Sequence, residues 1–584
     1  MKKPDGGDAP GSRPGAVTPT FERSFMHKAK RVMIIGLDGV PLDLIQGWAA
    51  EGHLPHMARL IDTGAVGSLR STIPPTSGPS WSSFVTGMNP GKTGIYDFLY
   101  RRDGSYSFPP VNASQRGGRT IWRTLSDAGY GVSVLNLPMS YPVERINGVM
   151  ISGWMTPYKA TDYVHPPELA AELEREVGNY RIYPTETFAE SRKESFWKAS
   201  FDLLDMRTRT ALYLAKTRPW DVFMAVFFDT DRILHQTWHY LTADHPWRTD
   251  REDKSESVRA YFQKVDDSIG RLLEHADEDT LVIVLSDHGM GQANNFIVLN
   301  NWLLDAGLLQ LKRDPWTRWK EFLFRRGFTL RNVHQLADRL HLAQQAEYVA
   351  GYFVDHLLKL AFLSFLDVDW KRSRAYSFGR HLGSIYVNVK GREPGGIVEP
   401  GQEYEAVRDE IERLAREFRD PHTGRQLIGE VIRREEVYSG PYLDRAPDLI
   451  LRPREPSDIF FGLADFGHRE TVSTVYRYSG MHRDYGMLIM NGPGVRRGGS
   501  VEDAVIHDVA PTVLHTMDLP VPADMDGHVL LDAFESEYAA AFPVRHAEPG
   551  GETGAGDGSQ SPIDYSEEGE KEIMKRLEGL GYLG

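Results

Sequence analysis

The chain contains no cysteine in 584 residues. This absence excludes disulfide bonds, thiolate metal ligands and thiol nucleophiles, so any bound metal must use His, Asp, Glu or hydroxyl oxygen. Long apolar runs are also missing. The start, residues 1–23, lacks the apolar core of a secretory signal. The most apolar later stretch, residues 352–366, is interrupted by Asp355, His356 and Lys359 and is shorter than the roughly 20 residues of a spanning helix. We predict no transmembrane segment and a cytoplasmic location.

Basic residues are outnumbered by acidic ones, with 67 Lys and Arg against 81 Asp and Glu, so the formal net charge is -14. Affinity for a polyanion comes mostly from neutralising phosphates with Lys and Arg, so this balance argues against a nucleic-acid polymer as partner. Hydrophobic residues make up 41% and charged residues 25% of the chain, the proportions of a globular enzyme. At this length we expect more than one structural unit, and the oligomeric state stays open.

Three short apolar runs predict buried strands, and each is followed by acidic residues. They are residues 32–37 before Asp38, 222–228 before Asp229 and Asp231, and 281–285 before Asp287. Helical periodicity at residues 200–216 and 257–275 lies between them. This alternation predicts an α/β fold with a mostly parallel central sheet flanked by helices. Ligands bind such sheets at the carboxyl ends of the strands, where the acidic residues would converge.

The simple alternation stops between residues 301 and 470, where we expect an inserted cap subdomain. A strand at 485–490 and a helix at 508–517 would then complete the core. The predicted units are a disordered arm over residues 1–25, a core over 26–300 and 471–540, a cap over 301–470, a linker over 541–562 and a C-terminal helix within 563–584.

Ser77 lies just before a predicted helix over residues 79–85. Pro79 suits the first position of a helix. The free N–H groups and the dipole of a helix start favour an anionic oxygen and can hold a phosphate. We interpret Ser77 as a nucleophile. The alternative is that its hydroxyl only caps the helix.

Asp231 and His235 are four residues apart, so on a helix they project from one face and can share a metal ion. The same spacing also occurs in surface pairs. Asp229 lies six residues from His235 and would face elsewhere. We therefore take Asp231 as the candidate ligand.

Asp287 and His288 directly follow the strongest strand signal, where both side chains can reach one ion. Gly289 lets the chain turn closely beside a ligand. His482 precedes the predicted strand at 485–490 and is uninformative alone.

The chain order of these candidates resembles that of the alkaline phosphatase superfamily. The order is Asp38, Ser77, Asp231, His235, Asp287, His288 and His482. Residues 34–39, 84–94 and 508–514 are similar to the type I phosphodiesterase and nucleotide pyrophosphatase branch, whose bacterial and archaeal relatives are described as phosphohydrolases or phosphomutases. The resemblance spans residues 31–530 and implies an alkaline-phosphatase-like sandwich.

The resemblance implies two divalent metal ions. One would be held by Asp38, Ser77, Asp287 and His288, and the other by Asp231, His235 and His482. Paired ions suit in-line displacement at phosphorus, because one activates the nucleophile and the other stabilises the leaving oxygen. A phosphoseryl intermediate on Ser77 is expected. The all-His and carboxylate ligand set favours Zn²⁺, with Mn²⁺ as the alternative.

Three positions depart from known signatures. Ser80 stands where nucleotide pyrophosphatases carry an Asn that binds the phosphate, which weakens a nucleotide assignment. Trp81 replaces the Arg that the sulfatase signature needs, so a sulfatase is less favoured. Residues 87–93 imitate a phosphate-binding loop, but three rather than four residues separate their glycines, and we reject an ATPase. Lys92 in this segment faces either the site or solvent.

The expected cap supplies weaker candidates. Residues 312–331 are basic and aromatic, and Trp316 and Trp319 share helical spacing. This segment either lies on a membrane surface or, as we favour, packs its aromatic face on the core. His381 and Arg392 flank the strand-like stretch of the cap and are candidate substrate contacts, as are Ser80 and Lys92.

The leading function is hydrolysis of a small-molecule phosphate ester, with a diester favoured over a monoester. A phosphomutase of phosphosugars uses the same nucleophile but returns the phosphate to its substrate. A binding protein that keeps the fold without turnover is the alternative of another class.

Overall fold

The computed structural model describes residues 27–186, 188–248, 254–329, 332–333, 361–379, 383–461, 466, 468–475, 478–548 and 563–579. The expected N-terminal arm over residues 1–25, most of the expected linker and the candidate His381 lie outside these ranges.

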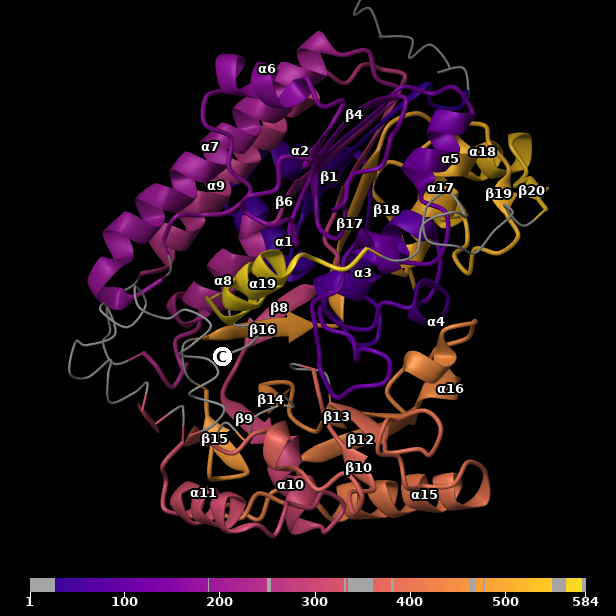
Figure 1. The fold of residues 1–584 in the computed structure, drawn as a ribbon. Coiled ribbons are helices and arrows are strands. Elements are labelled where there is room, and N and C mark those ends of the chain that lie inside the picture. Colours follow the sequence, from indigo (N-terminus) through magenta and orange to yellow (C-terminus); the bar gives the residue numbers. More distant parts are fainter. Residues whose placement is uncertain are drawn as a thin grey trace, which may run out of the picture.

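A nine-stranded sheet forms the centre of the molecule (Figure 1). Five parallel strands are neighbours in the order β7 (Thr280–Leu285), β1 (Arg31–Leu37), β6 (Val222–Phe227), β3 (Val132–Leu137) and β4 (Gly148–Ser152). The sheet continues through the antiparallel β17 (Tyr485–Asn491) to β2 (Ala65–Arg70) and β18 (Gly499–Ser500), and at the other edge to β5 (Val164–His165). The predicted mostly parallel α/β sheet is thus confirmed, and the three apolar runs are its central strands.

Both faces of the sheet are buried, which explains why its central strands are apolar throughout. In β1, Val32 and Ile34 belong to one hydrophobic cluster, while Met33 and Ile35 belong to the other. The alternation follows from the two-residue period of a strand. No polar face is therefore needed, and the strands appear in the sequence as continuous hydrophobic runs.

Helices cover the two faces in separate layers, as the ribbon in Figure 1 shows. One face packs against α1 (Leu42–Ala50), α2 (Pro55–Thr63), α6 (Leu169–Glu176), α7 (Lys193–Thr217), α8 (Asp229–Leu241) and α9 (Ser255–Leu273). The other packs against α3 (Ser77–Thr86), α5 (Ile121–Asp127), α17 (Val509–Thr516), α18 (Ser536–Ala541) and α19 (Glu567–Gly579). The short α4 (Pro90–Thr93) and the pair β19 (Val521–Pro522) and β20 (His546–Ala547) complete this side.

A separate set of elements lies beyond the carboxyl ends of the central strands (Figure 1). Its first sheet has the order β10 (Ala375–Tyr376), β11 (Ser384–Val387), β13 (Leu449–Pro453) and β12 (Ile428–Arg433), and its second has the order β14 (Asp458–Phe461), β9 (Asn295–Val298) and β15 (Val472–Thr474). Its helices within the described residues are α10 (Leu299–Asp305), α11 (Pro315–Arg325), α15 (Gln402–Glu417) and α16 (Arg434–Val437). The second sheet includes strands from both sides of the expected cap boundaries. We call this set of elements, residues 295–475, the cap.

A connection of the core reaches into the cap. Tyr106 stacks on Trp370 with ring centroids 3.6 Å apart, and Phe108 stacks on Phe378 at 4.3 Å. Both aromatic residues pack against the buried cluster of the cap. The chain that follows α3 and α4 therefore holds the cap against the core.

Among the helices within the described ranges, none combines the length and the apolar character needed to cross a membrane.

Candidate active site

Acidic side chains meet at the carboxyl ends of three adjacent parallel strands. Asp38 follows β1, Asp231 lies in the first turn of α8 after β6, and Asp287 and His288 follow β7. His482 approaches from β16 (Gly480–Arg483), which pairs with β8 (Gly289–Gln292) directly after His288. Strand order alone thus brings residues from distant parts of the chain to one edge of the sheet.

Ser77 is the first residue of α3 and is buried between two of these side chains. Its hydroxyl donates to Asp38 Oδ1 at 3.2 Å, and its Oγ lies 3.1 Å from His288 Nε2. The helix begins two residues earlier than predicted, and its N-cap is Thr76. Ser77 is therefore not the cap of this helix, and its hydroxyl is turned toward the acidic site.

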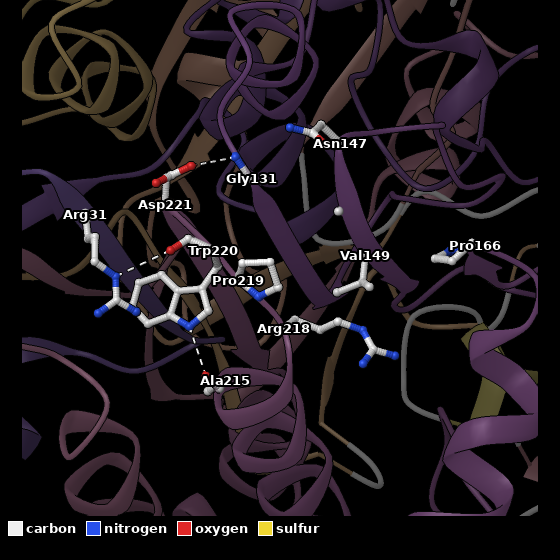
Figure 2. Close-up of a pocket in the computed structure, with 11 residues that line it drawn as sticks. Arg31, Gly131, Asn147, Val149, Pro166, Ala215, Arg218, Pro219, Trp220 and Asp221 are labelled. Atoms are coloured by element: carbon white, nitrogen blue, oxygen red, sulfur yellow. Dashed lines mark hydrogen bonds between the residues drawn. The ribbon is translucent and has the colours of Figure 1, made fainter.

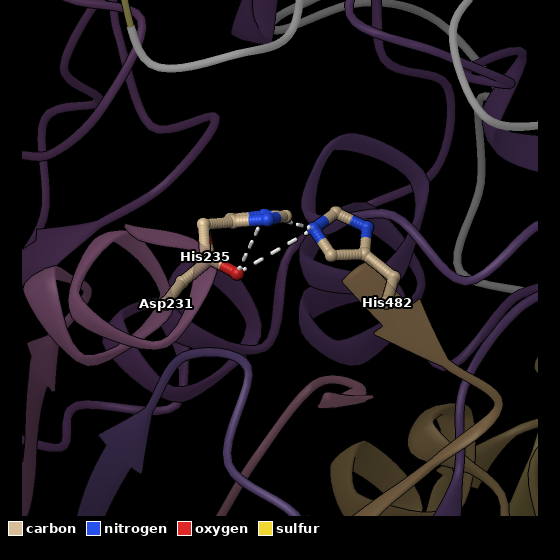
Figure 3. Close-up of side chains that lie close together, drawn as sticks. All are labelled: Asp231, His235 and His482. Atoms are coloured by element: carbon tan, nitrogen blue, oxygen red, sulfur yellow. Dashed lines mark hydrogen bonds and ion pairs between the residues drawn. The ribbon is translucent and has the colours of Figure 1, made fainter. Parts of the chain in front are cut away.

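Asp231, His235 and His482 form a second cluster of side chains (Figure 3). Asp231 Oδ1 lies 3.3 Å from His235 Nε2 and 3.4 Å from His482 Nε2, and the two Nε2 atoms are 2.9 Å apart. The predicted helical spacing of Asp231 and His235 is realised in α8.

Backbone carbonyls set the tautomers of these histidines. Nδ1 of His235 lies 2.8 Å from Gly480 O, and Nδ1 of His482 lies 2.9 Å from Pro75 O. A carbonyl oxygen only accepts a hydrogen bond, so each Nδ1 carries the proton and each neutral Nε2 presents a lone pair. His288 follows the same rule, with Nδ1 at 3.0 Å from Gly289 O. The lone pairs converge on the site, an arrangement that suits a cation.

Like charge accumulates in this buried space. Burial, followed by the charges of Asp287 and Asp231, raises the pKa of the Asp38 carboxyl well above its usual value. Burial and the charge of Asp231 raise the pKa of Asp287 to about 8. Carboxylates this close cannot all ionise at neutral pH without added positive charge.

Two donor groups in the described residues fit divalent ions. Asp231, His235 and His482 form one, and Asp38, Asp231 and His288 form the other, with the ligand atoms of each group within 4.8 Å of one another. Burial, with His288 next, lowers the pKa of His482 to about 3, so its imidazole is neutral and ready to bind a metal. Oδ2 of Asp287 is buried and accepts no hydrogen bond from the described residues. Charge, tautomer and donor type therefore all fit metal binding.

Neighbouring residues fix these ligands in place. The indole Nε1–H of Trp81 donates to Asp38 Oδ2 at 2.8 Å, and the Gly39 N–H donates to Asp287 Oδ1 at 3.3 Å. Gly39 has a φ of +73°, and a Cβ there would lie 2.6 Å from Asp231 Oδ1. The sequence did not predict that Trp81 and Gly39 would contact candidate ligands. It marked Trp81 only as a departure from the sulfatase signature. No sequence signal announces either contact.

Asp229, the neighbour of Asp231, points away as its spacing predicts. Its Oδ2 lies 2.6 Å from Arg207 Nη1, and both side chains are fully buried. The pair anchors the first turn of α8 to α7 and leaves Asp231 as the carboxylate that faces His235.

The weaker substrate candidates lie elsewhere. The Ser80 hydroxyl is buried against Ser71 and Thr72 at 2.6 and 3.0 Å. Lys92 lies beyond the far end of α3 from Ser77, and its ammonium donates to Asp526 Oδ1 at 2.5 Å and to a neighbouring carbonyl. Arg392 is paired with Asp448 inside the cap at 2.6 Å. The structure brings neither cation to the metal-ligand cluster.

The basic and aromatic segment also differs from our expectation. Trp316 and Trp319 of α11 are exposed, while Thr317, Lys320 and Phe324 form the buried side of the helix. The prediction that the aromatic face packs on the core is therefore wrong. Lys320 lies on the buried side of the helix instead, in an ion pair with Asp367 at 2.9 Å.

An open cavity of about 650 Å³ lies at the opposite end of the sheet (Figure 2). Arg31, Gly131 and Asp221, at the amino ends of β1, β3 and β6, line it together with Trp220. Its charged groups are engaged, since Arg31 stacks over the Trp220 ring at 3.4 Å and Asp221 accepts from Gly131 N at 2.7 Å. This cavity contains none of the candidate site residues.

Comparison with known proteins places the site in context. The sequence profile of the family described as type I phosphodiesterase / nucleotide pyrophosphatase matches residues 32–463, most of the chain and all but one of the candidate ligands. The chain belongs to this family. It is therefore a metal-dependent hydrolase of phosphoric esters, as the order of its candidate ligands implied.

Solved structures similar to this family member share little sequence with it. Human ectonucleotide pyrophosphatase / phosphodiesterase 5 is 13% identical, with a TM-score of 0.46 over 87% of this chain and 100% of that chain. Phosphonoacetate hydrolase from Sinorhizobium meliloti 1021, in complex with phosphonoformate, is 14% identical, with a TM-score of 0.49 over 83% of this chain and 95% of that chain. Murine ectonucleotide pyrophosphatase / phosphodiesterase 5, an inactive variant in complex with AMP, is 13% identical, with a TM-score of 0.46 over 84% of this chain and 95% of that chain. Among curated proteins, none shows significant sequence similarity to the chain.

Proposed function

We propose that the protein is a two-metal phosphodiesterase with Ser77 as its nucleophile. The observation that carries this proposal is the position of Ser77 Oγ, within 3.2 Å of Asp38 Oδ1 and 3.1 Å of His288 Nε2. The hydroxyl thus lies against the donor atoms of one proposed metal site. Its place at the start of α3 also directs helix N–H groups toward a bound phosphate.

The proposed ligand sets follow the two clusters. Asp231, His235 and His482, which form one donor group, would hold one ion. Asp38 and His288 of the other group would hold the second ion together with Ser77, which contacts both, and Asp287. When bound, the ions supply positive charge that favours the Ser77 alkoxide and the departing ester oxygen. Histidine and carboxylate donors favour Zn²⁺, with Mn²⁺ as the alternative.

The reaction has two displacement steps at phosphorus. Ser77 Oγ, having given its proton to solvent, forms a bond to phosphorus while the bond to the leaving alcohol breaks, and that alcohol takes up a proton from water. Water then attacks the phosphoseryl group. Its oxygen bonds to phosphorus as the bond between phosphorus and Ser77 Oγ breaks, one of its protons is lost to solvent, and Oγ takes up a proton, which restores the serine. The fixed Nδ1–H bonds of His235 and His482 keep these rings oriented throughout.

The preference for a diester rests on charge. A monoester carries more negative charge at the phosphate and needs added positive charge for recognition. The sequence assigns no residue to this role, and the two cationic candidates for substrate contact are engaged elsewhere, Lys92 with Asp526 and Arg392 with Asp448. A small-molecule diester, with its single negative charge, suits this site better.

The test compares hydrolysis of a bis-aryl phosphate diester, an aryl phosphate monoester and an aryl sulfate by the wild type and Ser77→Ala. We expect the diester to be the best substrate and turnover of Ser77→Ala to fall by about three orders of magnitude or more. The matched control is Ser83→Ala, because Ser83 is a buried serine of the same helix whose Oγ has no hydrogen-bond partner within the described residues. Unchanged turnover in Ser77→Ala would remove this residue from the mechanism.

Two further measurements separate the alternatives. Acid quenching during turnover, followed by mass spectrometry, should find a phosphate on the peptide that contains Ser77. A phosphosugar mutase would return the phosphate to its substrate and release no inorganic phosphate. Metal analysis should find two ions per chain, whereas less than one ion, with no rescue by Zn²⁺ or Mn²⁺, would support a binding protein.

A further inference from the structure

Helix α11 presents an exposed aromatic surface on the cap. Trp316, Trp319 and Phe322 are 56%, 51% and 46% exposed, and the rings of Trp319 and Phe322 stack with centroids 5.7 Å apart. Phe328, whose N–H donates to Leu323 O at the end of the helix, is 44% exposed. Leu366, whose carbonyl accepts from Lys312 Nζ just before the helix, is 54% exposed. These five residues are most of the eight large hydrophobic side chains that are exposed in the described ranges. Scattered apolar residues are normal on a surface, but a concentration of this kind marks an interaction site.

The helix that carries this surface is firmly held. Its inward side buries Thr317, Lys320 and Phe324, and Lys320 Nζ bonds both oxygens of Asp367 at 2.9 Å. The Asp314 side chain caps the helix by accepting from the N–H groups of Trp316 and Thr317. The aromatic side chains are therefore displayed outward by an anchored helix.

Arginines surround the aromatic rings in a chain of net charge -14. Arg313, Arg318, Arg325 and Arg326 are all exposed. The Arg326 guanidinium lies 4.6 Å from the centre of the Phe322 ring. Of the two acidic residues in the segment 312–326, Asp314 is engaged at the helix start and Glu321 pairs with Arg325 at 2.8 Å. The surface therefore combines large aromatic rings with local positive charge.

We propose that the α11 surface, defined by Trp316, Trp319, Phe322, Phe328, Leu366 and the four arginines, docks on an anionic lipid membrane. Tryptophan side chains are enriched at the level of the lipid head groups, and guanidinium groups pair with lipid phosphates. A second copy fits less well, because a symmetric pair would place these arginines against each other. The contact is peripheral, since no described helix is suited to span a bilayer.

The position of the helix suits such a contact. Figure 1 shows α11 on the side of the cap that is turned away from the central sheet. Docking there leaves the ligand cluster at the strand ends uncovered. Membrane binding is thus independent of hydrolysis, and a Ser77→Ala protein should bind vesicles as the wild type does.

The experiment measures cosedimentation of the full-length protein with vesicles. One set contains phosphatidylcholine and phosphatidylserine, and the other contains phosphatidylcholine alone. The aromatic variant is Trp316→Ser/Trp319→Ser/Phe322→Ser, and the charge variant is Arg318→Glu/Arg326→Glu.

Each variant has a matched control elsewhere on the surface. Tyr158→Ser/Tyr485→Ser removes two aromatic rings that are 70% and 54% exposed on the core. Arg413→Glu/Arg416→Glu reverses two charges on α15, another helix of the cap, where these arginine side chains are 59% and 73% exposed. Diester hydrolysis and the melting temperature of every variant verify that it is folded.

We expect the wild type to bind the anionic vesicles at least roughly tenfold more tightly than the neutral ones, and the charge variant to lose at least that factor. The aromatic variant should also lose binding, while both controls stay within about twofold of the wild type. Raising the salt from about 0.1 M to about 1 M should weaken binding, because the Debye length falls from about 10 Å to about 3 Å.

Three results would overturn the proposal. The first is a wild type that does not bind anionic vesicles. The second is a folded charge or aromatic variant that binds them as well as its control does. The third is a wild-type dimer in sedimentation velocity that the aromatic variant abolishes, without any vesicle binding, which would assign the surface to a second copy of the chain.

Discussion

Replacing Trp81 by Phe tests how the surroundings of Asp38 prepare it to bind a metal ion. The indole Nε1 lies 2.8 Å from Asp38 Oδ2, and both side chains are buried. Because this oxygen is already occupied, Oδ1 is the one turned toward Ser77 and His288. Phenylalanine keeps an aromatic ring in the space but removes the donor.

The magnitude follows from the charge of the acceptor. A hydrogen bond to a charged group contributes about 1.5–3 kcal/mol, and about 1.4 kcal/mol corresponds to a tenfold change in a binding constant. The loss of this bond should therefore weaken Zn²⁺ binding by about 10- to 100-fold, which agrees with the usual effect of removing a partner of a metal ligand.

Trp122→Phe is the matched control for this substitution. Trp122 is as fully buried as Trp81, and its Nε1 has no hydrogen-bond partner among the described residues. Both variants lose the same atoms and should lose stability through the smaller ring. Competition with a fluorescent Zn²⁺ chelator measures the affinity. Equal affinities for Trp81→Phe and Trp122→Phe would refute the assignment of Trp81 as a positioning residue.

Two further predictions concern the same ligands. Gly39→Ala should lower the metal content, since its Cβ would lie 2.6 Å from Asp231 Oδ1. The control is Gly52→Ala, because Gly52 has a φ of +81° and open space around it. This control should show only the backbone cost of about 1–2 kcal/mol in urea unfolding. In metal-free protein, folded Asp287 keeps its proton up to a pKa of about 8, against an ordinary value of 3.8 in the unfolded chain. The free energy of unfolding should therefore fall as the pH rises between these values, by up to about 1.4 kcal/mol per pH unit, and saturating Zn²⁺ should abolish this slope. A metal-free protein whose stability rises over that range would contradict the second prediction.

The central sheet and the acidic candidate ligands at its edge were predictable from the sequence for one physical reason. Strands buried on both faces leave continuous apolar runs, and the acidic residues that end these runs stand out against them. The runs became β1, β6 and β7, and their neighbour relations place Asp38, Asp231 and Asp287 together. His482 carries no such signal, because its position depends on the pairing of β16 with β8.

The substrate side was not predictable because it depends on which partner a charged side chain finds. Lys92 and Arg392 have suitable charge, but in the folded chain they pair with Asp526 and Asp448. These pairs join residues hundreds or tens of positions apart, and no local pattern indicates them. Trp81 shows the converse, since a residue without charge supplies the hydrogen bond that orients Asp38.

Helix α11 shows a similar limit of prediction from sequence, this time for an amphipathic pattern. Helical spacing predicts which residues share a face, but it does not say which face is buried. The aromatic side is the natural choice for the core, yet Lys320 lies inward because Asp367 compensates its burial with two bonds of 2.9 Å. Since a lysine that loses its partner is costly to bury, this ion pair fixes the rotation of the helix. Trp316 and Trp319 are consequently turned outward, on the surface that we propose docks on an anionic membrane.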